Sequence, residues 1–341
     1  MRKLFLTMFA AVALVGCNRE YVPVSPQEQH AISFGTVDTR AGLSDLQANG
    51  FGVWATVSSI GSTDVSYQPL FAEEEHVTYV TSRDEWTYEN EQLWIPNSIF
   101  HFFAAYPQGV FEQSQFEDES GKNYTLYTAN ITANGIADTP DILVATHVTD
   151  TTAESFDPDE VVPLSFNHLL SKVNVKISQN FDIDPDFNYY VTKVTITGVI
   201  GSATYGFLPI SDRFMQALDN ENAITVTLEK EYDTPVILRN VGNANPKVEL
   251  SVWGDGLMLL PQTVAANGVV IRVDYLYDVN LDDEELGTPK FVEGFIPATT
   301  WESGKSICYS LAISSQSNIV FSQPTIEPWG APQTGGTIII K

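Results

Sequence analysis

The chain has 341 residues, a length that suggests about two domains, and 43% of them are hydrophobic, which is enough to build real cores. Its 43 acidic and 17 basic residues give a formal net charge of −26. This balance argues against nucleic acid as a partner, since phosphates need basic contacts, and against electrostatic adhesion to anionic lipid. Any membrane contact would then come from an acyl anchor.

The first residues have the layout of an export signal. Arg2 and Lys3 precede an apolar run, Leu4 to Val15, that is shorter than the roughly 20 residues of a membrane-spanning helix. The run ends in Leu-Val-Gly-Cys, which resembles the lipobox of bacterial lipoproteins. We therefore predict a signal peptide over residues 1–16 and a diacylglyceryl anchor on Cys17. The alternative is an ordinary signal peptide with a chance cysteine at this place.

The region after the signal is predicted to form a tether and a first set of strands. Residues 17–30 are polar and contain two prolines, which indicates a tether. A strand is predicted over 31–37, a helical turn over 43–48 and a buried strand over 51–57. Short strands separated by turn residues follow, a pattern typical of β-sandwiches. The acidic run at 73–75 is predicted to be a solvated loop.

An acidic, Thr-rich segment over 149–163 indicates a domain boundary. We predict an N-terminal β-sandwich domain over 31–160 and a C-terminal one over 161–341. Alternating strands dominate the second domain, beginning with a run whose apolar positions are Val173, Val175 and Ile177. Only 211–219 looks helical in this half. The fold class predicted from these patterns is all-β.

The C-terminal tail, residues 331–341, has the properties of a strand that completes a sheet. Pro332, Gly335 and Gly336 precede a strongly β-forming run, Thr337-Ile338-Ile339-Ile340. A mobile segment of this kind is suited to fill a vacant strand position in another chain by β-augmentation. The alternative is that it pairs with its own domain as a final strand.

A series of stretches in order resembles the Bacteroidales fimbrillins, the lipoprotein-precursor subunits of surface pili. They are ISFGTVDTRAG, GFGVWA, LSFNHLLSKVNVKI, LLPQTVAANGVVIRVDY, TTWESGKSICYSLAI and IVFSQPTIEPW, between residues 32 and 329. The resemblance implies two tandem transthyretin-like β-sandwich domains. It also implies an outer-membrane lipoprotein precursor that a trypsin-like, Arg-specific protease cuts between Arg40 and Ala41. Subunits then polymerise by β-strand exchange into an extracellular fimbria that contributes to adhesion.

The sequence offers no catalytic or metal-binding pattern, so we predict no enzyme, cofactor or metal. The five histidines are scattered without H-E-x-x-H spacing, and the acidic run 182–186 lacks the glycine and glutamate of a calcium loop. The alternative function is a carbohydrate-binding surface lipoprotein of a glycan-uptake system, because exposed aromatic rings stack on sugars. The strand pattern favours core packing for most of the candidate rings, which are Trp86, Tyr88, Trp94, Tyr124 and Tyr127.

Overall fold

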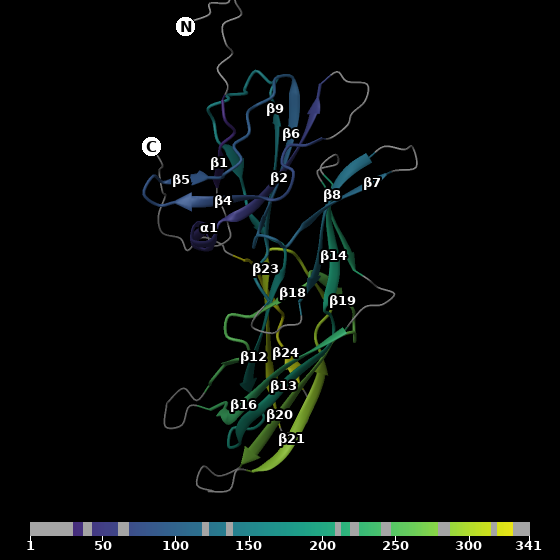
Figure 1. Cartoon of the computed structure of the whole chain (residues 1–341). Coiled ribbons are helices and arrows are strands. Elements are labelled where there is room, and N and C mark those ends of the chain that lie inside the picture. The colour runs from purple at the N-terminus through teal and green to yellow at the C-terminus, as the bar shows by residue number, and fades with distance from the viewer. Residues whose placement is uncertain are drawn as a thin grey trace, which may run out of the picture.

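The computed structural model describes residues 30–36, 43–60, 68–117, 123–133, 139–208, 213–218, 225–239, 247–278, 287–314 and 319–329. These residues fold almost entirely into β-strands, with a single helix, α1 (Leu43–Asn49), among them. The prediction of an all-β fold is therefore confirmed. The structure is elongated, with an N-terminal part at one end and a C-terminal part at the other (Figure 1).

The centre of the N-terminal part is a seven-stranded sheet. Its path runs through β11 (Asn167–His168), β9 (Leu143–Asp150), β6 (Ser98–Tyr106), β2 (Phe51–Ser59), β4 (Glu75–Val80) and β5 (Glu85–Thr87), and β3 (Gln68–Pro69) pairs with β2. Helix α1 precedes β2 and buries Leu46. Gly50 ends the helix in the left-handed region, with a φ of 74°.

Both faces of this central sheet are buried, because successive residues of its strands enter different cores. Val53 and Ala55 of β2 enter the cluster that we call core A, whereas Trp54 between them enters core B. β6 repeats the arrangement with Phe102 in core A and Phe103 in core B. This burial explains why both strands are largely apolar instead of alternating.

Each core is closed by a further β layer. Core A lies under a two-stranded parallel sheet of β1 (Phe34–Thr36) and β10 (Val162–Leu164). Core B lies under a four-stranded sheet with the order β15 (Arg213–Leu218), β14 (Ser202–Leu208), β8 (Asn123–Thr132) and β7 (Glu112–Glu117). The N-terminal part therefore consists of three β layers around two cores.

Strands β14 and β15 follow residue 200 in the sequence, yet they belong to a sheet of the N-terminal part. β14 pairs with β8, so hydrogen bonds cross the predicted boundary at 160/161 and that division stays a prediction. The prediction of a helix over 211–219 is wrong, because residues 213–218 form β15, antiparallel to β14. The hydrogen-bonding edge of β14 outweighs a modest local preference for helix, as tertiary context commonly does.

The C-terminal part is a sandwich of two sheets around core C. One sheet contains β17 (Leu250–Ser251), β12 (Ser171–Gln179), β23 (Lys305–Ile313) and β24 (Val320–Phe321), with β18 (Leu257–Leu259) and β25 (Thr325–Pro328) paired to it. The other contains β16 (Thr225–Ile237), β13 (Asn188–Ile200), β20 (Val270–Asp278) and β21 (Thr288–Phe295), and β19 (Gln262–Val264) pairs with β22 (Thr299–Trp301). Val173, Val175 and Ile177 all enter core C, which confirms the predicted alternation.

Hydrogen bonds and a ring contact hold the segment 149–163 against the central sheet. Thr151 N donates to Ser98 O over 3.0 Å, and Ser98 N donates to Thr151 Oγ1 over 2.9 Å. The Phe156 ring packs edge to face on Trp94, with ring centroids 5.2 Å apart. The segment therefore packs against the N-terminal part and does not run free between two bodies.

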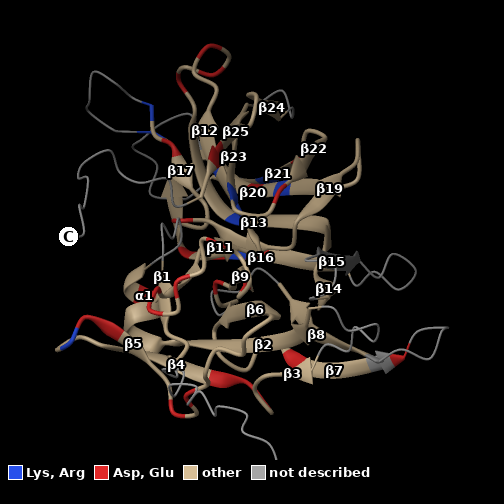
Figure 2. Ribbon diagram, turned by 90° about the horizontal axis from the view of Figure 1, so that it is seen from above, with Lys and Arg blue, Asp and Glu red and all other residues tan. Residues whose placement is uncertain are grey.

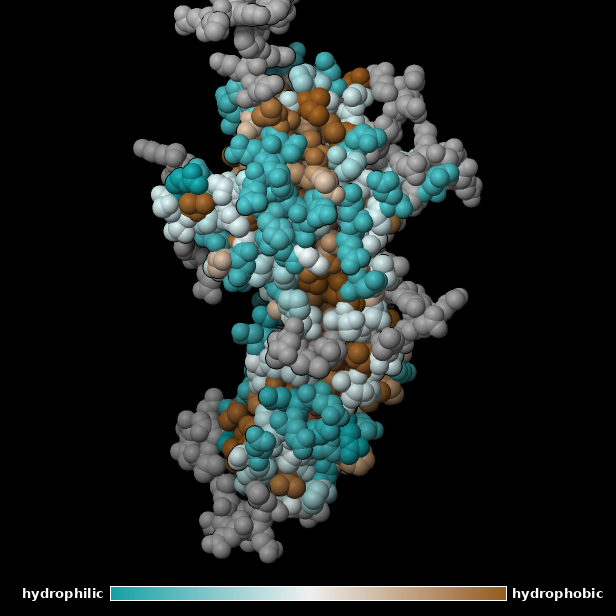
Figure 3. All heavy atoms as spheres, viewed as in Figure 1, coloured by the Kyte–Doolittle hydropathy of each residue, from teal (hydrophilic) through white to brown (hydrophobic). Residues whose placement is uncertain are grey.

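The N-terminal part is strongly anionic. Between positions 41 and 171 the sequence has no lysine or arginine besides Arg83 and Lys122, and Figure 2 shows acidic residues (red) around β4 and β5. The surface seen in Figure 3 is largely hydrophilic, with hydrophobic patches at the upper end and at the waist between the two parts. Among the described residues, no helix has the length and apolar character to cross a membrane.

A buried hydrogen bond in core C provides a test of the packing. The indole N–H of Trp301 donates to the Tyr309 hydroxyl over 2.9 Å, and burial raises the pKa of Tyr309 to about 12. Tyr309→Phe leaves the buried indole N–H without its acceptor. We expect the free energy of unfolding, measured by urea denaturation, to fall by about 1–3 kcal/mol.

The matched control is Tyr205→Phe in core B. The Tyr205 hydroxyl is buried and has no hydrogen-bond partner among the described residues. Removal of this hydroxyl should leave the free energy of unfolding unchanged or raise it. Equal losses in the two variants would contradict a stabilising role for the Trp301–Tyr309 bond.

Candidate functional site

The N-terminal strand is the candidate functional site. Residues 30–36 lie between two other segments, residues 92–94 on one side and β10 on the other, and cover core A. Figure 1 shows β1 where the described chain enters the molecule at its upper end. We call the receiving surface, made of Tyr88, residues 92–94, β10 and the part of core A beneath them, the strand seat.

Hydrogen bonds hold the strand on both sides. They are Ile32 N to Gln92 O (2.8 Å), Trp94 N to His30 O (3.2 Å), Val162 N to Ser33 O (2.7 Å) and Tyr88 Oη to Ile32 O (2.7 Å). The Tyr88 hydroxyl also accepts from Gln92 N over 3.1 Å, so one side chain joins the strand to its flank. Loss of the strand would leave backbone donors and acceptors on both flanks without partners.

The strand contributes two large apolar side chains to core A. Ile32 is 1% exposed and Phe34 is 3% exposed, whereas Ser33 between them faces outward and is half-buried. The Phe34 ring packs on Tyr88 with centroids 5.3 Å apart, and edge to face on Phe102 with centroids 5.8 Å apart. The strand therefore fills two adjacent positions in the core, and its departure would open both.

A buried carboxylate organises the flank of the strand seat. Glu75 is 7% exposed, and it accepts from Glu89 N over 3.1 Å, Asn90 N over 3.2 Å and Asn90 Nδ2 over 2.8 Å. These bonds fix the turn that leads to residues 92–94. The prediction of a solvated loop over 73–75 is wrong at this position, because Glu75 begins β4. No sequence signal marks Glu75 or Tyr88, since their partners are set by the turn.

The sequence-predicted site residues lie outside the described residues. They are Cys17, Arg40, Ala41, Thr337, Ile338, Ile339 and Ile340. Before the predicted cleavage position the described residues end at Thr36, and after it they begin again at Leu43. Trp329 is the last described residue before the tail, and its ring stacks on His168 with centroids 3.7 Å apart. Roles for these predicted residues stay predictions.

The histidines occupy separate structural positions. His168 is buried and its Nδ1 lies 2.9 Å from Asp141 Oδ2, while His30 Nδ1 lies 2.7 Å from Asp159 Oδ1 at the strand seat. Among the described residues, no three His, Cys, Asp or Glu side chains are grouped to hold a metal ion. Burial raises the pKa of the half-buried Cys308 thiol, which disfavours its reactive thiolate.

Most of the aromatic residues considered for sugar stacking pack into the cores. Trp86 and Tyr88 pack against core A, and Tyr127 is fully buried in core B. Trp94 also packs against core A, on Phe100 and Phe102, but it lines a pocket as well. Tyr124 is half-buried on β8 and belongs to neither core. The aromatic platform of the alternative function is therefore reduced to Tyr124 and the surroundings of Trp94.

The described residues form layered β-sheets in which a short N-terminal strand covers a core. A family model described as fimbrillin-like matches residues 39–329. The chain belongs to the fimbrillin-like family. No curated protein matches this chain.

The first of three similar solved structures shares the fold of this chain. A fimbrial protein from Bacteroides vulgatus is similar over 88% of this chain and 99% of its own, with 19% identity and a TM-score of 0.67. A candidate cell adhesion protein from Bacteroides uniformis covers 89% of this chain and 99% of its own, with 16% identity and a TM-score of 0.44. The tip fimbrial protein Mfa3 from Porphyromonas gingivalis, with C-terminal truncation, covers 88% of this chain and 98% of its own, with 11% identity and a TM-score of 0.36.

The buried carboxylate provides a test of the strand seat. Glu75→Gln keeps the side-chain volume but replaces one acceptor oxygen by a donor that faces other donors. We expect the free energy of unfolding to fall by about 1–3 kcal/mol, and amides of residues 30–36 and 89–94 to exchange hydrogen faster.

The exposed neighbour Glu73 provides the control. Glu73→Gln should leave both the free energy of unfolding and the exchange rates unchanged. If amide hydrogen exchange at residues 30–36 is unchanged in Glu75→Gln, Glu75 does not stabilise the strand seat.

Proposed function

We propose that this chain is a lipid-anchored precursor of a pilus subunit that polymerises by β-strand exchange. Acylation at Cys17 anchors the precursor in the outer membrane. A trypsin-like protease cuts between Arg40 and Ala41, and the strand that precedes the cut leaves the strand seat. The tail of another pilus subunit, self or related, then occupies the vacancy, and the mature subunit joins an extracellular fimbria that contributes to adhesion.

The geometry of the strand seat is the observation that carries this proposal. Burial of one large apolar side chain stabilises by about 1.5–3 kcal/mol, and a net hydrogen bond contributes about 0.5–1.5 kcal/mol. With Ile32 and Phe34 buried and bonds on both flanks, loss of the strand costs several kcal/mol. This loss is a large fraction of the roughly 5–15 kcal/mol that stabilise a domain. The vacant position therefore favours binding of a replacement strand.

The strand lies in a position where a single cut can release it. Residues 30–36 precede the predicted cleavage site, so cleavage leaves them joined to the fold by the noncovalent contacts of the seat alone. Ile32 and Phe34 belong to core A, and neither core B nor core C includes a residue of this strand. The two other cores therefore keep their packing when the strand departs.

The tail has apolar side chains at the same spacing as those that the first strand places in the strand seat. Ile32 and Phe34 point inward from alternate positions of an extended chain, two residues apart. In an extended tail, Ile338 and Ile340 share one face in the same way, and Ile339 points to the other face. Ile338 and Ile340 would then replace the two lost side chains, and Ile339 would take the outward position of Ser33.

Cleavage at Arg40 is testable with a chain that lacks residues 1–17. Trace trypsin should cut after Arg40 and yield polymers that are visible by electron microscopy. Arg40→Ala should remain uncut at this position and monomeric, because the strand stays covalently attached and its seat stays filled. Equally efficient polymerisation of Arg40→Ala would overturn the strand-removal mechanism.

Arg83 provides the control for protease specificity. It is exposed, pairs with Glu85 over 2.9 Å and lies in the turn between β4 and β5, away from the strand seat. Arg83→Ala should polymerise like the parent chain after trypsin treatment.

The face of the tail that enters the seat is testable by substitution. We expect Ile338→Ser with Ile340→Ser to abolish polymer formation, because both substitutions place hydroxyls in an apolar core. Ile339→Ser changes the outward face and should preserve polymer formation. The measurement is polymer yield after cleavage, with the unfolding transition of each monomer as control. Loss of monomer stability on deletion of residues 337–341 would instead favour pairing of the tail with its own domain.

A further inference from the structure

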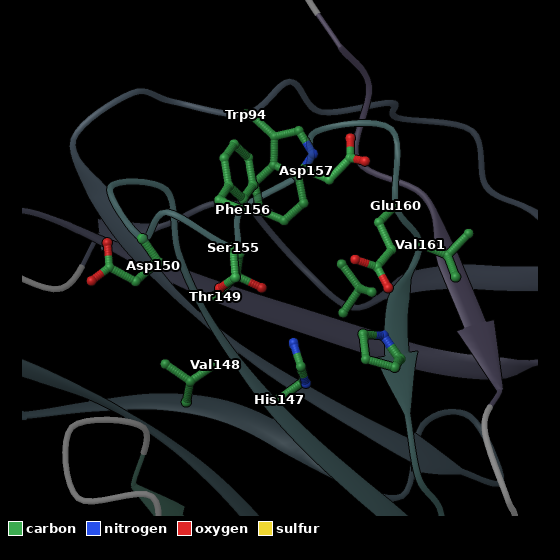
Figure 4. A pocket seen from close by; sticks show the side chains of 13 residues that line it. Trp94, His147, Val148, Thr149, Asp150, Ser155, Phe156, Asp157, Glu160 and Val161 are labelled. Carbon is green, nitrogen blue, oxygen red and sulfur yellow. The ribbon is translucent and has the colours of Figure 1, made fainter.

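A pocket opens at the upper end of the N-terminal part, between the end of β9 and the loop that returns to β10 (Figure 4). Its volume is about 500 Å³. Sites for small molecules span roughly 300–1,000 Å³, so the pocket has the size of a small-molecule site.

The rim of the pocket is built from consecutive turns that side chains fix. Asp150 Oδ1 accepts from Thr152 N over 2.8 Å, and Asp157 Oδ1 accepts from Asp159 N over 3.0 Å. The indole N–H of Trp94 donates to the carbonyl of Pro158 in the same loop over 3.2 Å. These bonds preorganise the wall, which reduces the entropy lost when a ligand binds.

Aromatic rings and hydrogen-bond acceptors line different parts of the pocket. Trp94 and Phe156 pack together on one side. Glu160 lies beside Val161, and Figure 4 shows the Glu160 carboxylate and the His147 imidazole directed into the same space. A ligand that fits must present an apolar face to the rings and hydrogen-bond donors to Glu160.

The charge of the site selects against anionic ligands. The described residues that line the pocket include three carboxylates, those of Asp150, Asp157 and Glu160, and no lysine or arginine. The surrounding anionic surface of the N-terminal part has the same sign. Burial lowers the pKa of His147, so at neutral pH the imidazole is uncharged and offers one donor and one acceptor.

We propose that this pocket binds a neutral saccharide of one or two rings. A sugar ring combines an apolar C–H face, which suits the Trp94 and Phe156 wall, with hydroxyl donors, which suit the carboxylate of Glu160. A lysine or arginine side chain shares this pairing of an apolar stem and donors, but it fills only a small part of about 500 Å³. The volume of the pocket therefore favours a saccharide over a lysine or arginine side chain.

The site adjoins the strand seat and shares Trp94 and β10 with it. β10 pairs with β1 and lines the pocket through residues 162 and 163. A replacement strand that bonds to Trp94 and β10 would hold both in place, so a subunit in the filament would keep the pocket.

Saccharide binding is testable with the full chain by saturation-transfer NMR and isothermal titration calorimetry. The probes are neutral oligosaccharides that end in glucose, galactose, mannose or N-acetylglucosamine, the corresponding sialylated and sulfated sugars, and a trilysine peptide. We expect binding of at least one neutral sugar, with the acidic sugars at least tenfold weaker. Glu160→Gln should weaken binding about tenfold, as expected for loss of a hydrogen bond to a charged group.

Glu154→Gln is the matched control, because Glu154 is exposed on the same loop but does not line the pocket. It should bind the neutral sugar like the parent chain. Ser155→Ala, a second exposed position that does line the pocket, should weaken binding without altering the fold. No binding of any neutral sugar, equal binding by Glu160→Gln and the parent, or trilysine binding that neutral sugars do not displace would overturn the proposal.

Discussion

The N-terminal strand is held in a layered β structure by two buried side chains and by backbone hydrogen bonds on both flanks. Ile32 and Phe34 enter core A, and residues 92–94 and β10 supply the bonds. In the proposed strand exchange, another chain would have to replace this contact set, which is limited to one short strand.

The remainder of the structure is held together by contacts that do not involve the first strand. The central sheet is buried on both faces, and its second face packs in core B against β8 and β14. β14 comes from the later part of the sequence, so the N-terminal part is tied to the C-terminal part by a hydrogen-bonded ladder. Neither core B nor core C includes a residue of the first strand.

Several elements followed directly from local pattern. The alternation at Val173, Val175 and Ile177 predicted a half-buried strand, and the continuous apolar run at 51–57 predicted a buried one. Local pattern failed where partners decide the outcome. Residues 213–218 have a modest helix preference but pair with β14, and Glu75 belongs to an acidic run but is buried and accepts hydrogen bonds from the turn at residues 89–90.

The sequence by itself determined the all-β class, the buried phase of the main strands and the family, because apolar periodicity and ordered motifs are properties of neighbouring residues. The tertiary structure alone decided that β14 joins the N-terminal part and that the first strand covers a core. It also decided that residues 150–163 shape a pocket. These features depend on contacts between residues far apart in the chain, and one strand pattern is compatible with many pairings.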